Sequence, residues 1–134
     1  MDAENLTAII SSLNDRVTER IIALESETDT ALAGLRWCWL ALGSEGRMEQ
    51  TLATDQDNAL IFHAADTAQH AALLAFAERV NARLDACGFP LCKGGIMAGN
   101  PKWCLSTADW QRQFAEWIDH GSPESLLHAS IFFD

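Results

Sequence analysis

Basic residues are scarce in this chain of 134 residues. Nine Lys and Arg stand against 19 Asp and Glu, which gives a net charge of −10 at pH 7. A protein that binds nucleic acid non-specifically needs a basic surface, and so does one that docks on an anionic membrane. The composition therefore argues against nucleic acid and membrane as partners, although nine cations still suffice for one basic pocket.

The sequence also lacks a targeting signal and a long apolar run. Its N-terminus is polar, and no apolar stretch approaches the length of a membrane span. The four cysteines follow no zinc-ribbon or CxxC spacing: Cys38, Cys87, Cys92 and Cys104. We therefore expect a cytoplasmic protein with reduced, buried or half-buried thiols.

Three stretches have the apolar periodicity of helices. Residues 3–33 carry a stripe at three- and four-residue steps: Leu6, Ile9, Ile10, Leu13, Val17, Ile21 and Leu24. Residues 66–87 form a second amphipathic helix that ends at Gly88. A third is capped by Thr107 and reaches about His120, with an expected buried face of Trp110, Phe114, Trp117 and Ile118. Ser122 and Pro123 then start a short helix.

Four stretches read as extended: residues 35–42, 57–63, 89–97 and 131–134. The first is apolar nearly throughout, as a central strand covered on both faces would be. Lys93-Gly94-Gly95 indicates a bulge in the third, or a segment that borders a nucleotide pocket. Helices thus alternate with strands, and the predicted fold class is α/β, or α+β with a mixed sheet flanked by helices.

Two aspartates, Asp55 and Asp57, stand at the head of the second strand. Side chains at i and i+2 of a strand leave the same face, so these carboxylates would repel each other. A hard divalent cation such as Mg²⁺ or Mn²⁺ removes that conflict and prefers carboxylate oxygens. A third carboxylate would complete a clamp for an in-line displacement at phosphorus.

Upstream of these aspartates, Gly43-Ser44 follows a strand and precedes a predicted helical turn. Glycine lets a ligand approach the backbone, and free N–H groups at a helix start favour an anion. Arg47 is able to neutralise a phosphate bidentately. The order and spacing of these residues favour a site that holds a triphosphate at one edge and metal ions at the other.

The combination of GS, ten residues and DxD resembles the DNA polymerase beta-like nucleotidyltransferase superfamily. The longer string GSEGRMEQTLATDQDNAL resembles the nucleotidyltransferase domain of bacterial signalling proteins that also carry CBS or cyclic-nucleotide-binding domains. These are relatives of the uridylyltransferase that modifies the PII nitrogen regulator. CKGGIMAGNPKWCLSTADW and SIFFD are also similar to that family, so the resemblance spans residues 35–134. The polar Gln56 and Asn58 depart from the general superfamily pattern, which has apolar residues there.

The resemblance implies a role for each matching residue. Gly43, Ser44 and Arg47 would hold the nucleotide phosphates, and Asp55 and Asp57 would bind Mg²⁺. Asp134 is the first candidate for the third metal ligand, ahead of Glu49 and Asp109. Asn100, Lys102 and Trp103 would line the base or acceptor site, unless they form only a turn with a packed tryptophan.

The function implied is transfer of a nucleoside monophosphate from a nucleoside triphosphate, such as ATP or UTP, to a hydroxyl of a protein or small molecule. Two alternatives stay open: a nucleotide-binding sensor module without turnover, and a small toxin–antitoxin-type nucleotidyltransferase. The expected organisation is an N-terminal helix over residues 1–34 and a catalytic domain over residues 35–134, cut from a longer protein with further domains. The first helix would pack on the sheet, lead in from an upstream domain, or form a dimer.

Overall fold

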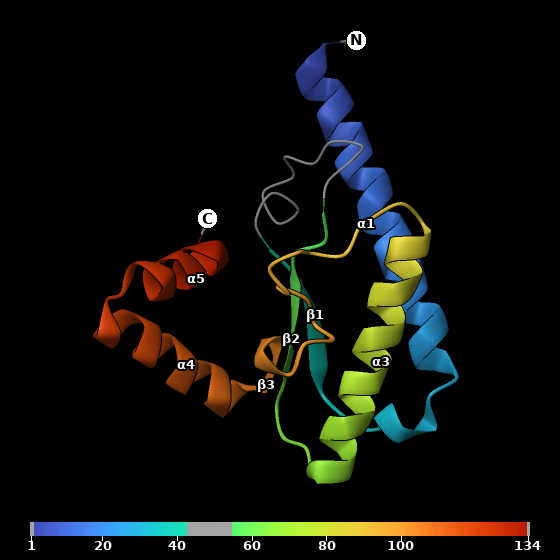
Figure 1. Cartoon of the computed structure of the whole chain (residues 1–134). Coiled ribbons are helices and arrows are strands. Elements are labelled where there is room, and N and C mark those ends of the chain that lie inside the picture. The colour runs from blue at the N-terminus through green and yellow to red at the C-terminus, as the bar shows by residue number, and fades with distance from the viewer. Residues whose placement is uncertain (1, 43–54, 134) are drawn as a thin grey trace.

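The computed structural model describes residues 2–42 and 55–133, with backbone alone for residues 130–133. The helices are α1 (Ala3–Glu27), α3 (Thr67–Ala86), α4 (Thr107–His120) and α5 (Pro123–Phe133), and the 3₁₀ helices are η1 (Thr30–Leu32) and η2 (Pro101–Trp103). The strands are β1 (Trp37–Ala41), β2 (Asn58–Phe62) and β3 (Cys104–Ser106). Figure 1 shows α1 and α3 on one side of the strands and α4 and α5 on the other, which confirms a mixed α+β fold with a long N-terminal helix.

The sheet has the order β1-β2-β3 and is mixed. β1 pairs antiparallel with β2, with Trp39 opposite Leu60, and β2 pairs parallel with β3, with Leu60 opposite Cys104. The prediction that β1 is a central strand is wrong, because it lies at the edge and Cys38 and Ala41 are exposed. β2 is the central strand, and four of its five residues are buried.

Alternate residues of β2 face two separate apolar clusters. Leu60 and Phe62 join the cluster under α1 and α3, to which Trp37 and Trp39 of β1 also belong. Ala59 and Ile61 point to the opposite side and join the cluster under α4 and α5. This alternation follows from the two-residue period of a strand and explains why nearly every β2 residue is buried.

The tryptophans of the second cluster pack against one another. Trp103 lies 5.8 Å from Trp117 and 6.1 Å from Trp110 between ring centroids, and the Trp110 indole donates to the Leu60 carbonyl oxygen at 3.1 Å. Core packing is therefore the role of Trp110 and Trp117, as predicted. Ile118 was expected in the same face but is 59% exposed.

α3 begins and ends where the sequence predicts. Asp66 is its N-cap and forms a capping box with Gln69, and Gly88 follows the helix with φ of +99°. α4 begins one residue earlier than expected, because Ser106 is the N-cap and accepts from the Asp109 backbone N–H. Ser122 caps α5 through the Ser125 backbone N–H, as predicted.

Two predicted strands are wrong. Residues 89–97 form turns rather than a strand, and Gly94 lies in a turn instead of a bulge. The backbone of residues 131–133 belongs to α5. The strand prediction failed because so short an apolar run does not distinguish a strand from a helix. The third strand of the sheet is β3, which the sequence did not predict.

Candidate functional site

Asp55 and Asp57 lie immediately before β2, between the end of β1 and the segment 90–96. Hydrogen bonds on both sides hold this stretch of backbone: Leu42 N–H to the Asp57 carbonyl oxygen at 2.9 Å, and Gln56 N–H to the Pro90 carbonyl oxygen at 2.8 Å. The Asn58 N–H also donates to the Ile96 carbonyl oxygen, at 3.1 Å. The two carboxylates are thus presented from backbone that is fixed at several points.

The side chains of residues 55–58 alternate between exposed and buried. Asp55 is exposed and Asp57 half-buried, whereas Gln56 and Asn58 are only 3% and 1% exposed. The two carboxylates therefore leave the same side of the chain, as their spacing predicts. The two amides leave the other side and enter the interior.

Gln56, Asn58 and Asn81 of α3 form a buried amide cluster. The Asn81 amide nitrogen donates to Gln56 Oε1 at 2.8 Å and to Asn58 Oδ1 at 3.0 Å. The Gln56 amide nitrogen donates to the carbonyl oxygens of Asn81 and Phe89, both at 2.9 Å. Because each buried amide has partners, the cluster tolerates burial and ties the site to α3.

The amide cluster also anchors the segment after the turn at Gly95. The Ala98 N–H donates to Asn58 Oδ1 and the Gly99 N–H to Asn81 Oδ1, both at 2.8 Å. Sequence reasoning noted Gln56 and Asn58 only as a departure from the superfamily pattern and missed Asn81. The available signal was a polar residue next to Val80 on the apolar face of a helix.

The environment of Asp57 disfavours its negative charge. Burial is the main reason that the pKa of Asp57 is raised, and the neighbouring charge of Asp55 raises this pKa further. A hydrogen bond with the Cys92 thiol works in the opposite direction and lowers it. Burial likewise raises the pKa of Cys92, which keeps that thiol protonated as a donor. A bound cation would relieve this electrostatic conflict, so the two carboxylates fit a divalent metal ion.

The third carboxylate expected for such a site is not found among the described side chains, where no group of three His, Cys, Asp or Glu is placed to hold a metal. Ser106 pairs with Phe62, at the end of β2 that is farther from Asp57. Asp109 comes three residues after Ser106, in the first turn of α4, and therefore lies away from Asp57. Glu49 and Asp134 lie outside the described residues, as do Gly43, Ser44 and Arg47.

A hollow of about 380 Å³ lies between α3 and residues 91–100, and Asn81 is one of the residues that line it. Leu91 and Met97 give it apolar walls, and Gly95 and Asn100 also line it. Gly95 has φ of +74°, and the Asn100 amide nitrogen donates to its carbonyl oxygen at 2.8 Å. Trp103 is buried among aromatic rings. For this residue, the prediction of a tryptophan packed after a turn is therefore correct.

Comparison with known proteins identifies one family. Residues 1–124 match the family model described as "Putative nucleotidyltransferase DUF294". The matched region includes α1, the three strands, both aspartates and the buried amide cluster. No curated protein and no solved structure matches the chain. In the part of the chain that the structure describes, no helix has the length and apolarity to cross a membrane.

Proposed function

Because the chain belongs to the DUF294 family of nucleotidyltransferases, we propose that it transfers a nucleoside monophosphate from a nucleoside triphosphate to a hydroxyl group. Asp55 and Asp57 would bind Mg²⁺ or Mn²⁺ in this reaction. The observation that carries the proposal is the fixed pair of carboxylates before β2, in which Asp57 is half-buried beside a second negative charge. Because the pKa of Asp57 is raised by burial and by the neighbouring charge of Asp55, a bound cation would favour its ionised form, which supports a metal-binding role.

The proposed reaction is an in-line displacement. The acceptor oxygen forms a bond to the α-phosphorus while the bond from that phosphorus to the bridging oxygen breaks, and pyrophosphate leaves. A bound divalent cation supplies charge neutralisation and lowers the pKa of the attacking hydroxyl. Asp55 and Asp57 would hold that cation, and the hydroxyl proton would pass to solvent or, alternatively, to one of the two carboxylates. Gly43, Ser44 and Arg47 would hold the triphosphate.

The acceptor that we propose is a protein side chain or a small molecule. The net charge of −10 disfavours a nucleic-acid acceptor, whose phosphates the surface would repel. By similarity to signalling proteins of this type, the chain would act in the bacterial cytoplasm alongside further domains of a longer protein. The nucleotide would be UTP or ATP, as for protein uridylyl- and adenylyltransferases.

The experiment that tests this function measures label transfer and pyrophosphate release with each α-labelled nucleoside triphosphate. Wild type and Asp55→Asn/Asp57→Asn are compared with Mg²⁺, with Mn²⁺ and with EDTA. We expect metal-dependent transfer by wild type and a loss of at least about 100-fold in the variant. Asp66→Asn is the matched control, because Asn replaces Asp well as an N-cap of α3. Equal transfer by wild type and the double variant would refute the assignment.

A nucleotide sensor without turnover is the second candidate function. A sensor would use the same Asp55 and Asp57 and would need no third carboxylate, and the described side chains provide these two at the site. Calorimetry separates the two candidates. A sensor would bind nucleotide and metal through Asp57 but release no pyrophosphate. A transferase would bind them and also release pyrophosphate.

A further inference from the structure

A short segment, residues 90–96, is tied to the backbone on both sides of Asp57. The two residues that flank Asp57 donate their N–H groups to the carbonyl oxygens of Pro90 and Ile96, at 2.8 and 3.1 Å. Within this segment, the Cys92 side chain hydrogen-bonds to the Asp57 side chain. This contact therefore joins two pieces of chain that backbone hydrogen bonds already hold together.

The Cys92 sulfur is itself fixed within the segment. The backbone groups of Gly94 and Ile96 hydrogen-bond to this sulfur, and the Cys92 N–H donates to the Met97 sulfur at 3.4 Å. Because backbone N–H groups take acceptor positions on the sulfur, its single proton is left for the Asp57 carboxylate, which only accepts when ionised. Cys92 is half-buried, so water competes for this bond less than it would at an exposed thiol.

A neutral donor suits a carboxylate that has to hold a cation. A lysine or arginine in the same place would offset the negative charge of Asp57 and repel the metal ion. The thiol leaves that charge in place and occupies one of about four lone-pair positions of the carboxylate. It also restrains the orientation of the side chain, as the hydrogen-bond partners of metal ligands usually do. The Cys92 contact is therefore compatible with a metal ion at Asp57.

We propose that Cys92 is a positioning residue for the metal site: its S–H group donates to the Asp57 carboxylate and fixes the orientation in which that carboxylate would hold the cation. The inference rests on the proposed function, because it concerns how Asp57 binds a metal ion and, through it, a nucleotide. Cys92 would touch no reacting group itself. Its replacement should therefore weaken metal binding more than it weakens the fold.

Electron paramagnetic resonance of Mn²⁺ with a non-hydrolysable nucleoside triphosphate tests the inference. We expect Cys92→Ala to bind the complex at least about 10-fold more weakly than wild type, and Cys92→Ser, which keeps a neutral donor, to stay within about 3-fold of it. Cys87→Ala is the control, because Cys87 is exposed at the end of α3, and should match wild type. Wild-type binding by Cys92→Ala would overturn the inference. A loss in Cys92→Ser as large as in Cys92→Ala would also overturn it, because the donor would then not matter.

Asp57→Asn in the same titration separates this inference from the metal site itself. Weak binding by Asp57→Asn together with wild-type binding by Cys92→Ala would overturn the inference alone, whereas a wild type that binds no complex would remove both. The contact also has a readout without metal, the infrared S–H stretching band that Cys92→Ala removes. We expect this band to move to higher wavenumber in Asp57→Ala, because the thiol loses its acceptor. A band that stays in place would show that the thiol does not donate to Asp57 and would overturn the inference.

Discussion

At the scale of single residues, the buried amides of Gln56 and Asn58 account for polar residues where an apolar strand would be expected. Their partners are Asn81 and the backbone of residues 89 and 98. By fixing these two side chains inside the protein, the fold turns Asp55 and Asp57 outward. The amides are thus positioning residues for the carboxylates, although they touch no reacting group themselves.

Asn81→Ala is expected to destabilise the protein by about 2–4 kcal/mol. The substitution leaves Asn58 Oδ1 with one donor fewer and removes the acceptor of the Gly99 N–H, in a place with little access to water. Urea denaturation measures the change in the free energy of unfolding. Gln111→Ala, on the exposed side of α4, is the control and should change it by less than about 0.5 kcal/mol. Equal effects of both substitutions would contradict the role given to the amide cluster.

Asp57→Asn is expected to stabilise the metal-free protein at neutral pH. The pKa of Asp57 is raised above 3.8 in the folded state, so its ionisation favours the unfolded chain. Its stabilising contribution is present below the unfolded pKa and is lost as the pH rises through the folded pKa. Urea midpoints should therefore differ at about pH 7 and converge as the pH falls toward about 4.

The same urea denaturation, repeated with Mg²⁺, tests whether Asp57 binds a metal ion. Mg²⁺ at millimolar concentration should raise the urea midpoint of wild type at neutral pH and leave that of Asp57→Asn unchanged, because ligand binding stabilises only a protein that binds it. A variant that is less stable than wild type without metal at neutral pH would contradict the inference that the Asp57 charge destabilises the folded protein.

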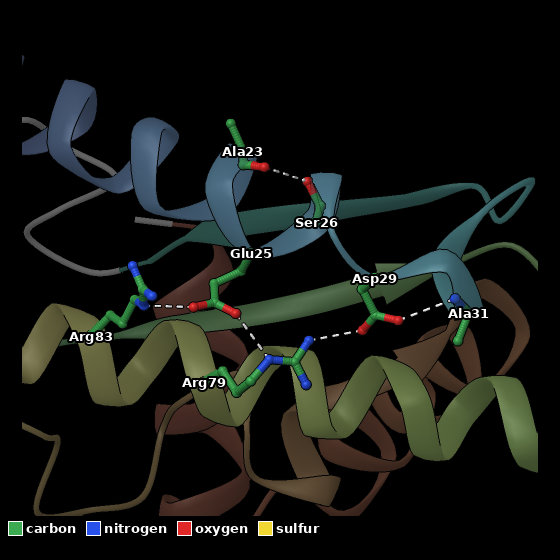
Figure 2. Close-up of polar contacts among 7 residues, drawn as sticks. All are labelled: Ala23, Glu25, Ser26, Asp29, Ala31, Arg79 and Arg83. Carbon is green, nitrogen blue, oxygen red and sulfur yellow. Dashed lines mark hydrogen bonds and ion pairs between the residues drawn. The ribbon is translucent and has the colours of Figure 1, made fainter.

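At the scale of elements, ion pairs join α1 to α3. Glu25 contacts both Arg79 and Arg83, and Arg79 also reaches Asp29, which accepts from the Ala31 N–H as N-cap of η1 (Figure 2). The Glu25 and Asp29 side chains are only 12% and 18% exposed. Such a network fixes the C-terminal half of α1 more strongly than a single exposed ion pair would.

Glu25→Ala is expected to cost about 1 kcal/mol of stability, because two arginines lose their shared carboxylate. The control is Glu27→Ala, an exposed residue at the end of the same helix. The difference between the two variants in thermal unfolding should shrink in about 1 M NaCl, which screens exposed charges. A difference that is absent at low salt would show that the network contributes nothing to the packing of α1.

Gly99→Ala is expected to destabilise the protein by about 1–3 kcal/mol, because the segment after Gly95 packs closely on α3. A Cβ atom at Gly99 would lie 2.8 Å from Asn81 Oδ1 and 3.0 Å from Glu78 Cα. At Gly94 the nearest atom is Cys92 Sγ at 3.8 Å, so Gly94→Ala serves as the control. Chemical denaturation should separate the two alanine variants, and similar midpoints would contradict the close approach.

Long amphipathic helices and the first two strands could be predicted from the sequence, whereas short or uniformly apolar segments could not. α3 has a capping box and a clear apolar period, which act locally. β3 has only three residues, and it is a strand because it pairs with β2. Residues 131–133 are apolar without a period, so nothing local distinguishes strand from helix.

At the scale of the whole molecule, one sheet separates two apolar clusters, and the candidate site lies at the end of the sheet where β2 begins. The pairing of Asp55 with Asp57 could be predicted because it depends on neighbouring residues. The link to Asn81 depends on a contact between residues 25 positions apart in the sequence, as does any third ligand from a distant segment. Such contacts follow from tertiary packing and leave only a weak local signal, here one asparagine on the buried face of α3.

We propose that Asp55 and Asp57 together bind a divalent metal ion and, through it, a nucleotide. Electron paramagnetic resonance of Mn²⁺, titrated with a non-hydrolysable nucleoside triphosphate and the protein, tests it most directly. We expect wild type to bind the Mn²⁺–nucleotide complex, and Asp57→Asn to bind it at least about 10-fold more weakly while Asp66→Asn matches wild type. Equal binding of the complex by wild type and Asp57→Asn would contradict the claim.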